Sequence, residues 1–171
     1  MAGATTNFAW PFPTTGDPAN VAPDDQTMLS AVDGTLGNAL TAYTPVWTAV
    51  TTPPALGTGT LSGRFKQFGK WGWYTINFTP DGTTTFGTGA WRFTLPPTWR
   101  MLTLNATAGH VWAFDTSTTT TALGEMIPVA AGPPTTIEFR GHASTVAASV
   151  TVPFAWATTD HLYIEGLVEL V

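Results

Sequence analysis

The chain has 171 residues, enough for one ordinary domain with an appendage, and 43% of them are apolar, which is sufficient for a buried core. Only 10% are charged and the net charge is −5, with six lysines and arginines, so the composition excludes a basic surface for nucleic acid or membrane lipid. The absence of cysteine excludes disulfides and thiolate metal sites. Because the chain has no continuous apolar run, we expect neither a signal peptide nor a membrane anchor. The absence of cysteine also fits synthesis in a reducing cytosol, which we expect.

Residues 1–22 are predicted to form an extended N-terminal arm, because prolines and short polar residues leave little room for regular structure. Three aromatic side chains, Phe8, Trp10 and Phe12, cannot be buried by the arm itself. They either pack on the arm's own domain or form a docking site for a neighbouring subunit or a different protein.

Residues 23–42 are predicted to form a short oligomerisation helix. Pro23 suits a first helical turn, and we expect the helix to continue to Leu40. Its apolar residues are spaced by 3, 4, 3 and 4, the register of a short coiled-coil seam. Because two heptads with two glycines are too weak to stand alone, we expect a parallel three-helix bundle in a homotrimer; the alternative is an amphipathic helix lying on its own sheet. The expected oligomerisation residues are Leu29, Val32, Leu36, Ala39 and Tyr43.

Residues 43–171 contain short segments of alternating apolar and polar residues, separated by glycine and proline turns. About one residue in five is threonine, which favours strands. The pattern predicts an all-β fold, an antiparallel β-sandwich or jelly-roll. The polar run 116–121 is predicted to be an exposed, mobile loop. The strand candidates begin near Thr44, Thr60, Trp71, Ala90, Met101, His110, Gly124, Thr135, Ser144 and His161.

No motif points to catalysis or to a metal. The serines lie in no Gly-x-Ser-x-Gly turn, and the carboxylates form no recognisable glycosidase pair. Glu165 and Glu169 share a terminal strand and are interpreted as solvated edge residues. Asp160 and His161 are the only adjacent acid and imidazole, and adjacent residues of a strand point to opposite faces. The three histidines, His110, His142 and His161, are isolated. We therefore expect a protein that is not an enzyme, with no cofactor and no metal.

Eight tryptophans are the remaining unusual feature, and sugar-binding modules stack the faces of such rings on pyranoses. Other tryptophans are expected in the core or in an interface. The expected core or interface set is Trp47, Trp91, Trp112 and Trp156. The expected exposed set, which gives the candidate glycan contacts, is Trp71, Trp73 and Trp99.

Segments 43–49, 59–65, 68–70 and 83–96 resemble a module in minor tail and tail-fibre-like proteins of actinobacterial phages. Asp17-Pro18-Ala19-Asn20-Val21 and the helix resemble the short N-terminal connectors of those proteins. The resemblance covers most of residues 17–100 and fades after Trp99. It implies a homotrimeric, β-structured virion component without catalytic residues. Because such fibres usually carry long shafts or further domains, a capsid decoration or head-fibre role suits this chain as well.

We therefore expect a non-enzymatic bacteriophage structural protein, a small trimeric module exposed on the tail or the capsid. Its expected partners are other copies of itself and other virion proteins, with no nucleic acid and no membrane. The alternative is a carbohydrate-binding receptor-recognition module that contacts a host cell-surface glycan.

Overall fold

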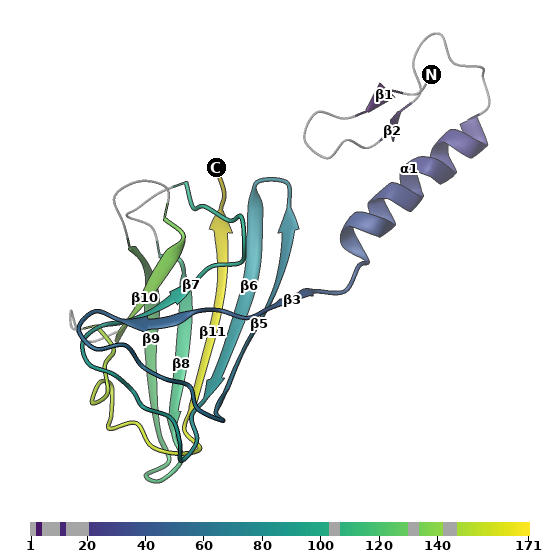
Figure 1. The fold of residues 1–171 in the computed structure, drawn as a ribbon. Coiled ribbons are helices and arrows are strands. Elements are labelled where there is room, and N and C mark those ends of the chain that lie inside the picture. Colours follow the sequence, from purple (N-terminus) through teal and green to yellow (C-terminus); the bar gives the residue numbers. More distant parts are fainter. Residues whose placement is uncertain (1–2, 5–10, 13–20, 103–106, 130–133, 142–146) are drawn as a thin grey trace. The chain divides into compact units, whose positions relative to one another are not determined.

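The computed structural model of the protein describes residues 3–4, 11–12, 21–102, 107–129, 134–141 and 147–171 (Figure 1). The chain divides into two compact units, Met1–Leu40 and Thr41–Val171. Among the described residues, no helix is both long enough and apolar enough to cross a membrane.

The N-terminal unit contains two very short strands and one helix. β1 (Gly3–Ala4) pairs antiparallel with β2 (Pro11–Phe12), so the expectation of an arm that is extended throughout is wrong. β2 contacts α1 (Val21–Leu36). Phe8 and Trp10 of the expected docking arm lie outside the described residues, as does the side chain of Phe12.

The helix α1 ends four residues before the expected Leu40. The amide of Gly37 donates to the carbonyl of Asp33 at 2.6 Å, and the side-chain amide of Asn38 donates to the carbonyl of Gly34. A Cβ at position 37 would lie 2.7 Å from the carbonyl oxygen of Asp33, so glycine suits this close approach, and both bonds satisfy carbonyls of the last helical turn. The expected extension of the helix to Leu40 is therefore wrong.

The second unit is one nine-stranded sheet in which every pair of neighbours is antiparallel. The order across the sheet is β3-β5-β6-β11-β8-β9-β10-β7-β4. Its two edge strands, β3 and β4, are joined by residues 44–46 alone, so the sheet must curl until its edges approach each other (Figure 1). The predicted all-β antiparallel class is confirmed. The strands are β3 (Thr41–Tyr43), β4 (Trp47–Ala49), β5 (Thr60–Phe68), β6 (Trp71–Thr79), β7 (Trp91–Thr94), β8 (Gly109–Asp115), β9 (Thr120–Val129), β10 (Thr136–Gly141) and β11 (His161–Glu169).

The curled sheet packs its two halves face to face over an aromatic core. Trp47 on β4 and Trp91 on β7 lie 4.7 and 6.1 Å from Phe78, ring centroid to ring centroid, although Phe78 is on the distant strand β6. Trp156, from the segment before β11, lies 5.1 Å from Trp91. The expected burial of Trp47, Trp91 and Trp156 is confirmed, since each is less than 9% exposed. Burying a large apolar side chain stabilises the fold by about 1.5–3 kcal/mol.

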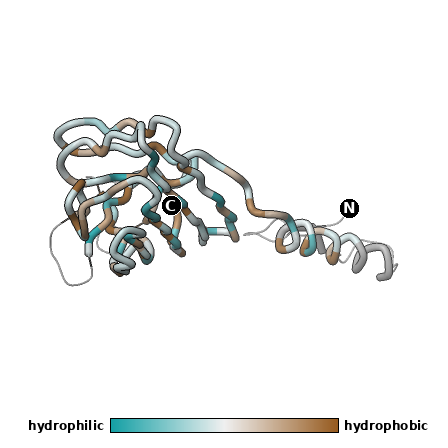
Figure 2. Tube along the Cα trace, turned by 90° about the horizontal axis from the view of Figure 1, so that it is seen from below, coloured by the Kyte–Doolittle hydropathy of each residue, from teal (hydrophilic) through white to brown (hydrophobic). Residues whose placement is uncertain are grey.

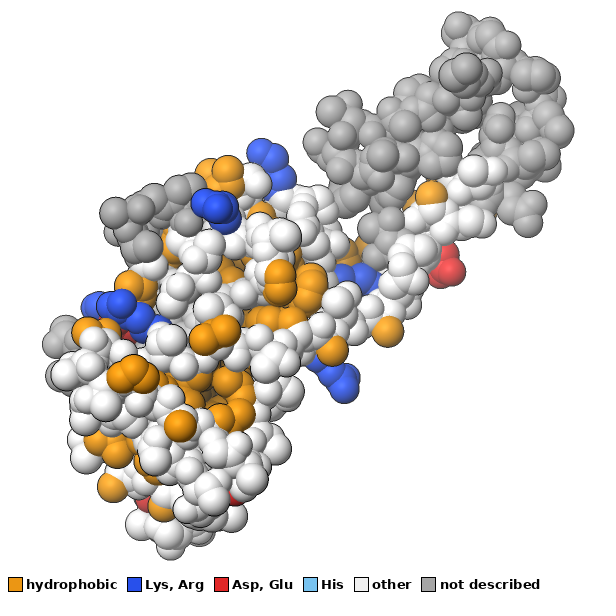
Figure 3. All heavy atoms as spheres, viewed as in Figure 1, with side chains coloured by type: hydrophobic (Ala, Val, Ile, Leu, Met, Phe, Trp, Pro, Cys, Tyr) orange, Lys and Arg blue, Asp and Glu red, His pale blue; other side chains and the backbone are white. Residues whose placement is uncertain are grey.

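Polar and apolar residues alternate along the strands, which is the pattern of strands with one buried face (Figure 2). Charged side chains are sparse on the face of the β-sheet unit that Figure 3 displays, in keeping with the low charge of the sequence. The second unit is therefore an apolar body with mostly neutral polar groups on its surface.

Residues 116–119 of the polar run form a tight turn between β8 and β9, and Thr120 and Thr121 begin β9; the run is exposed from residue 117 on, as expected, and its mobility stays a prediction. The carboxylate of Asp115 accepts hydrogen bonds from the amide and the hydroxyl of Thr118, at 3.1 and 2.7 Å. Hydrogen bonds from the Ser117 and Thr118 side chains hold the pKa of Asp115 below its usual value. The amide of Thr116 donates to the buried carboxylate of Asp160 at 3.0 Å. Hydrogen bonds from Thr116 and Thr118 to the carboxylates of Asp160 and Asp115 thus stabilise the turn.

Candidate functional site

One face of strands β5, β6, β11, β8 and β9 is turned to solvent and carries many aromatic side chains; we call it the outer face. Residues that oppose each other on neighbouring strands share a face, so the register assigns its members. Glu165 on the central strand β11 lies opposite Thr75 on β6 and opposite His110 on β8. The aromatic side chains that the register places on this face are Phe68, Trp71, Trp73, Trp112, Phe114 and Tyr163.

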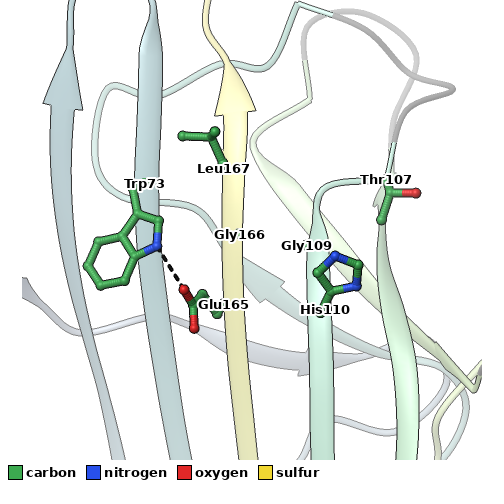
Figure 4. A pocket seen from close by; sticks show the side chains of 7 residues that line it. All are labelled: Trp73, Thr107, Gly109, His110, Glu165, Gly166 and Leu167. Atoms are coloured by element: carbon green, nitrogen blue, oxygen red, sulfur yellow. Dashed lines mark hydrogen bonds between the residues drawn. The ribbon is translucent and has the colours of Figure 1, made fainter.

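A hollow of about 500 Å³ lies in the outer face where β8 begins beside β11 (Figure 4). The pairing of these two strands stops at Glu165 and His110, while β11 continues beside β6 as far as Glu169. The indole of Trp73 stands on one side of the hollow and the imidazole of His110 on the other, with Glu165 between them (Figure 4). The full lining is Trp73, Thr107, Gly109, His110, Glu165, Gly166 and Leu167.

A buried hydrogen bond on the inner side of the sheet fixes the spacing of the strands at this hollow. The hydroxyl of Tyr74 donates to the carbonyl of Ala108 at 3.0 Å. A Cβ on Gly166 would lie 2.1 Å from that carbonyl oxygen and 2.6 Å from the tyrosine ring, so only glycine leaves room for the bond. Burial raises the pKa of Tyr74, which keeps its hydroxyl protonated and able to donate. The strand spacing that forms the hollow is therefore fixed by packing inside the folded sheet.

The carboxylate of Glu165 is held in place by two neutral donors. The indole Nε1 of Trp73 donates to Oε1 at 3.1 Å, and the hydroxyl of Tyr163 donates to Oε2 at 3.0 Å. Partial burial, together with the hydrogen bond to Glu165 and its charge, raises the pKa of Tyr163, so its hydroxyl remains a donor. Each carboxylate oxygen can accept more than one hydrogen bond, so Glu165 presents two oriented oxygens to the hollow that can each accept a further hydrogen bond.

Two of the three expected glycan contacts lie on the outer face. Trp71 is 50% exposed, and Trp73 is half-buried at the wall of the hollow. Trp99, expected to be exposed, is 3% exposed, so that expectation is wrong. Its ring packs on Phe65 with a centroid distance of 5.2 Å and covers Gly72, where a Cβ would lie 2.4 Å away. A ring covered in this way cannot stack on a sugar.

Trp112 was expected in the core or an interface. It is 40% exposed in the chain, so it is not a core residue, and its place in an interface stays a prediction. On β8 the two neighbours of Trp112, Val111 and Ala113, are buried, so strand alternation turns Trp112 outward. Its ring stacks on that of Phe114 at 5.5 Å with an interplanar angle of 4°. Because Trp112 lies directly opposite Tyr163, this stack extends the aromatic surface beyond the hollow.

The sequence analysis missed Glu165, His110, Tyr163 and Leu167 as members of a site. Glu165 was interpreted as a solvated edge residue, but β11 lies between β6 and β8 in the sheet. The alternation of outward residues with the buried residues Leu162, Ile164 and Val168 along 161–169 was a usable signal, since it places Tyr163, Glu165 and Leu167 on one face. What the sequence could not show was which strands would lie on either side.

The adjacent pair Asp160 and His161 does not form a catalytic dyad. The carboxylate of Asp160 is fully buried and accepts from the amide of Ala157 at 2.7 Å. His161 is exposed, and its Nδ1 lies 3.0 Å from the hydroxyl of Thr79. In the part of the chain that the structure describes, no three His, Asp or Glu side chains cluster in a way that could hold a metal ion; His142 lies outside that part.

The expected oligomerisation residues are divided between two elements. Leu29 and Leu36 lie on α1 and are 63% and 55% exposed, and Val32 between them is half-buried. Ala39 follows the end of the helix, and Tyr43 lies on β3. The ring of Tyr43 packs edge-on against Phe65 at 5.7 Å, so its place in a helical seam is wrong. The glycine and asparagine that end α1 separate these two residues from the helical register.

Comparison of the chain with protein-family models, with curated proteins and with solved structures gave no match.

Proposed function

We propose that the protein is a non-enzymatic structural component of a bacteriophage particle, synthesised in the host cytoplasm and incorporated into the virion. In this proposal the N-terminal unit assembles copies of the chain and joins them to other virion proteins, and the β-sheet unit is displayed. The observation that carries it is the helix α1, which presents Leu29 and Leu36 to solvent at 63% and 55% exposure. The resemblance of most of residues 17–100 to phage tail-fibre-like modules supports the same role.

A homotrimer would cover these apolar residues. Leu29, Val32 and Leu36 are spaced by 3 and 4 residues and therefore share one face of α1. Each leucine that becomes buried between copies contributes about 1.5–3 kcal/mol. One short helix per chain gives a small contact, which is why we propose that assembly also uses the rest of the N-terminal unit.

We propose two alternative positions for the module on the particle and give them equal standing. A minor tail or fibre position is supported by the resemblance, and a capsid decoration or head-fibre position, in which the β-sheet unit is displayed on the particle surface, is the alternative. Cryo-electron microscopy of particles labelled with an antibody against the β-sheet unit separates them. Particles that lack the protein altogether would contradict both positions.

The assembly proposal is tested by light scattering of the full chain after size-exclusion chromatography. We expect a trimer, and we expect the double variant Leu29→Lys, Leu36→Lys to be a monomer with an unchanged β-sheet circular dichroism spectrum. The matched control is Met28→Lys, because Met28 lies on the same helix outside the seam and is 37% exposed. A wild-type monomer at concentrations up to about 100 μM, together with monomers on the particle, would refute the trimer.

A second role, carbohydrate binding for receptor recognition, is supported by a different observation. The outer face combines exposed aromatic rings with the oriented carboxylate of Glu165. This role is compatible with display on a particle and needs no catalytic group. Cleavage of a polysaccharide by the purified protein would contradict the non-enzymatic part of the proposal.

A further inference from the structure

We infer that the hollow between Trp73, Glu165 and His110 binds a neutral saccharide, with one sugar ring against the indole and its hydroxyls bound to the Glu165 carboxylate. The inference deepens the second proposed role by assigning its site, and it does not depend on a place in the virion. Its grounds are the size, the chemistry, the charge and the preorganisation of the hollow.

The size and shape of the hollow fit a small ligand. Its volume of about 500 Å³ lies within the range of about 300–1,000 Å³ that small-molecule sites occupy. The backbone of Gly166 lies between the outward side chains of Glu165 and Leu167, which deepens the surface there (Figure 4). The buried bond from Tyr74 to Ala108 fixes this arrangement in the absence of a ligand.

The lining matches the two kinds of surface that a sugar presents. A pyranose has C–H groups on its ring faces and hydroxyls around its edge, so it needs an apolar aromatic surface beside hydrogen-bonding groups. Trp73 and Leu167 supply the apolar part. Glu165, His110 and Thr107 supply acceptors and donors. A purely apolar ligand would displace water from the remaining acceptor positions of the Glu165 carboxylate without replacing its hydrogen bonds, which is unfavourable.

The charge of the site selects against anions. Among the described residues that line the hollow none is lysine or arginine, and the only fixed charge is the carboxylate of Glu165. Glu125 lies opposite His110 on β9 and Lys66 lies opposite Trp73 on β5, so the charges flanking the hollow are of both signs and the carboxylate inside it decides its charge. The chain as a whole carries a net charge of −5. Neutral sugars are therefore favoured over phosphorylated, sulfated or sialylated glycans.

The acceptor at the centre of the site is ordered before a ligand arrives. Glu165 receives one hydrogen bond from Trp73 on β6 and one from Tyr163 on its own strand, so both oxygens are already oriented. Binding then loses little side-chain entropy. The stacked rings of Trp112 and Phe114 continue from Tyr163 across β8, which provides a surface for further sugar units of an oligosaccharide.

The experiment is a glycan array with the labelled full-length chain, followed by titration calorimetry with the best neutral oligosaccharide. We expect Glu165→Gln to weaken binding at least tenfold, because an amide replaces one acceptor oxygen by a donor. We expect saccharide binding to change the tryptophan fluorescence of the wild type. We expect Trp73→Phe to weaken binding and to remove this change. The matched control is Glu169→Gln, which changes the same residue type on the same strand and face outside the hollow.

Three results would overturn the inference. The first is no binding of any neutral saccharide at millimolar concentration by a wild-type chain that is folded. The second is binding that Glu165→Gln and a second variant, Leu167→Arg, leave unchanged while their unfolding curves match the wild type. The third is loss of self-association in these variants, which would show that another copy of the chain occupies the face. Trimer mass and particle incorporation are measured separately, so failure of the virion proposal is distinguishable from failure of this one.

Discussion

Replacing Gly166 by alanine is expected to destabilise the β-sheet unit, because the added Cβ would lie 2.1 Å from the Ala108 carbonyl oxygen and 2.6 Å from the ring of Tyr74. Either the strands move apart or the tyrosine moves, and the second movement breaks the buried bond between Tyr74 and Ala108. Overpacking costs about 1–3 kcal/mol, unpaired buried groups cost about 1–3 kcal/mol, and alanine in a strand recovers about 0.5–1 kcal/mol relative to glycine. The expected net loss is about 2–4 kcal/mol.

The assay is urea unfolding followed by tryptophan fluorescence, at one protein concentration, because the proposed assembly would make the midpoint depend on concentration. The control is Gly82→Ala, since no atom lies within 4 Å of a Cβ at that position. This control is expected to change the free energy of unfolding by less than about 0.5 kcal/mol. If Gly166→Ala were as stable as Gly82→Ala, the packing of Tyr74 beneath β11 would not be as described.

Three further outcomes are expected. Asp160→Asn is expected to lower the free energy of unfolding by about 2–4 kcal/mol, because its NH2 group would face one of the two backbone amides that donate to the buried carboxylate. An unchanged urea midpoint would refute this. Trp99→Ala is expected to cost about 3–5 kcal/mol and the exposed Trp71→Ala less than about 0.5 kcal/mol, and urea midpoints in the reverse order would contradict their placement. Hydrogen bonds, first from Thr58, lower the pKa of Asp81 from 3.8 to about 2. The unfolded carboxyl therefore takes up its proton first, and the stability that Asp81 contributes is present above about pH 4 and is lost as the pH falls through about 2. Asp81→Asn is expected to remove this part of the acid dependence in unfolding curves, and an identical acid dependence in the two proteins would contradict it.

The strand alternation was sufficient to predict the fold class, because each strand of a half-exposed antiparallel sheet must place its apolar residues on one side. Trp91 and Phe93 illustrate this, since both are buried and Arg92 between them is not. Alternation was not sufficient for Trp112, whose size suggested burial while its register directed it outward. For Trp99 no periodic signal exists, because it follows a proline-containing turn outside any strand.

The candidate site combines residues from strands that are distant in the sequence. Trp73 and Glu165 are 92 positions apart, and their hydrogen bond exists only because β11 inserts beside β6. An insertion of this kind depends on long-range pairing, which local propensity does not encode. The same pairing makes β11 a central strand and turns Glu165 from an expected edge residue into the centre of an aromatic surface.

The sequence by itself determined the composition, the low charge and the antiparallel β class, because these follow from residue types and short-range patterns. Only the tertiary structure decided the order of the nine strands, the burial of Trp99 and the meeting of Trp73, Glu165 and His110 around one hollow. The physical reason is that a strand's alternation specifies which residues share a face, while the neighbours of that face are chosen by packing across the whole curled sheet.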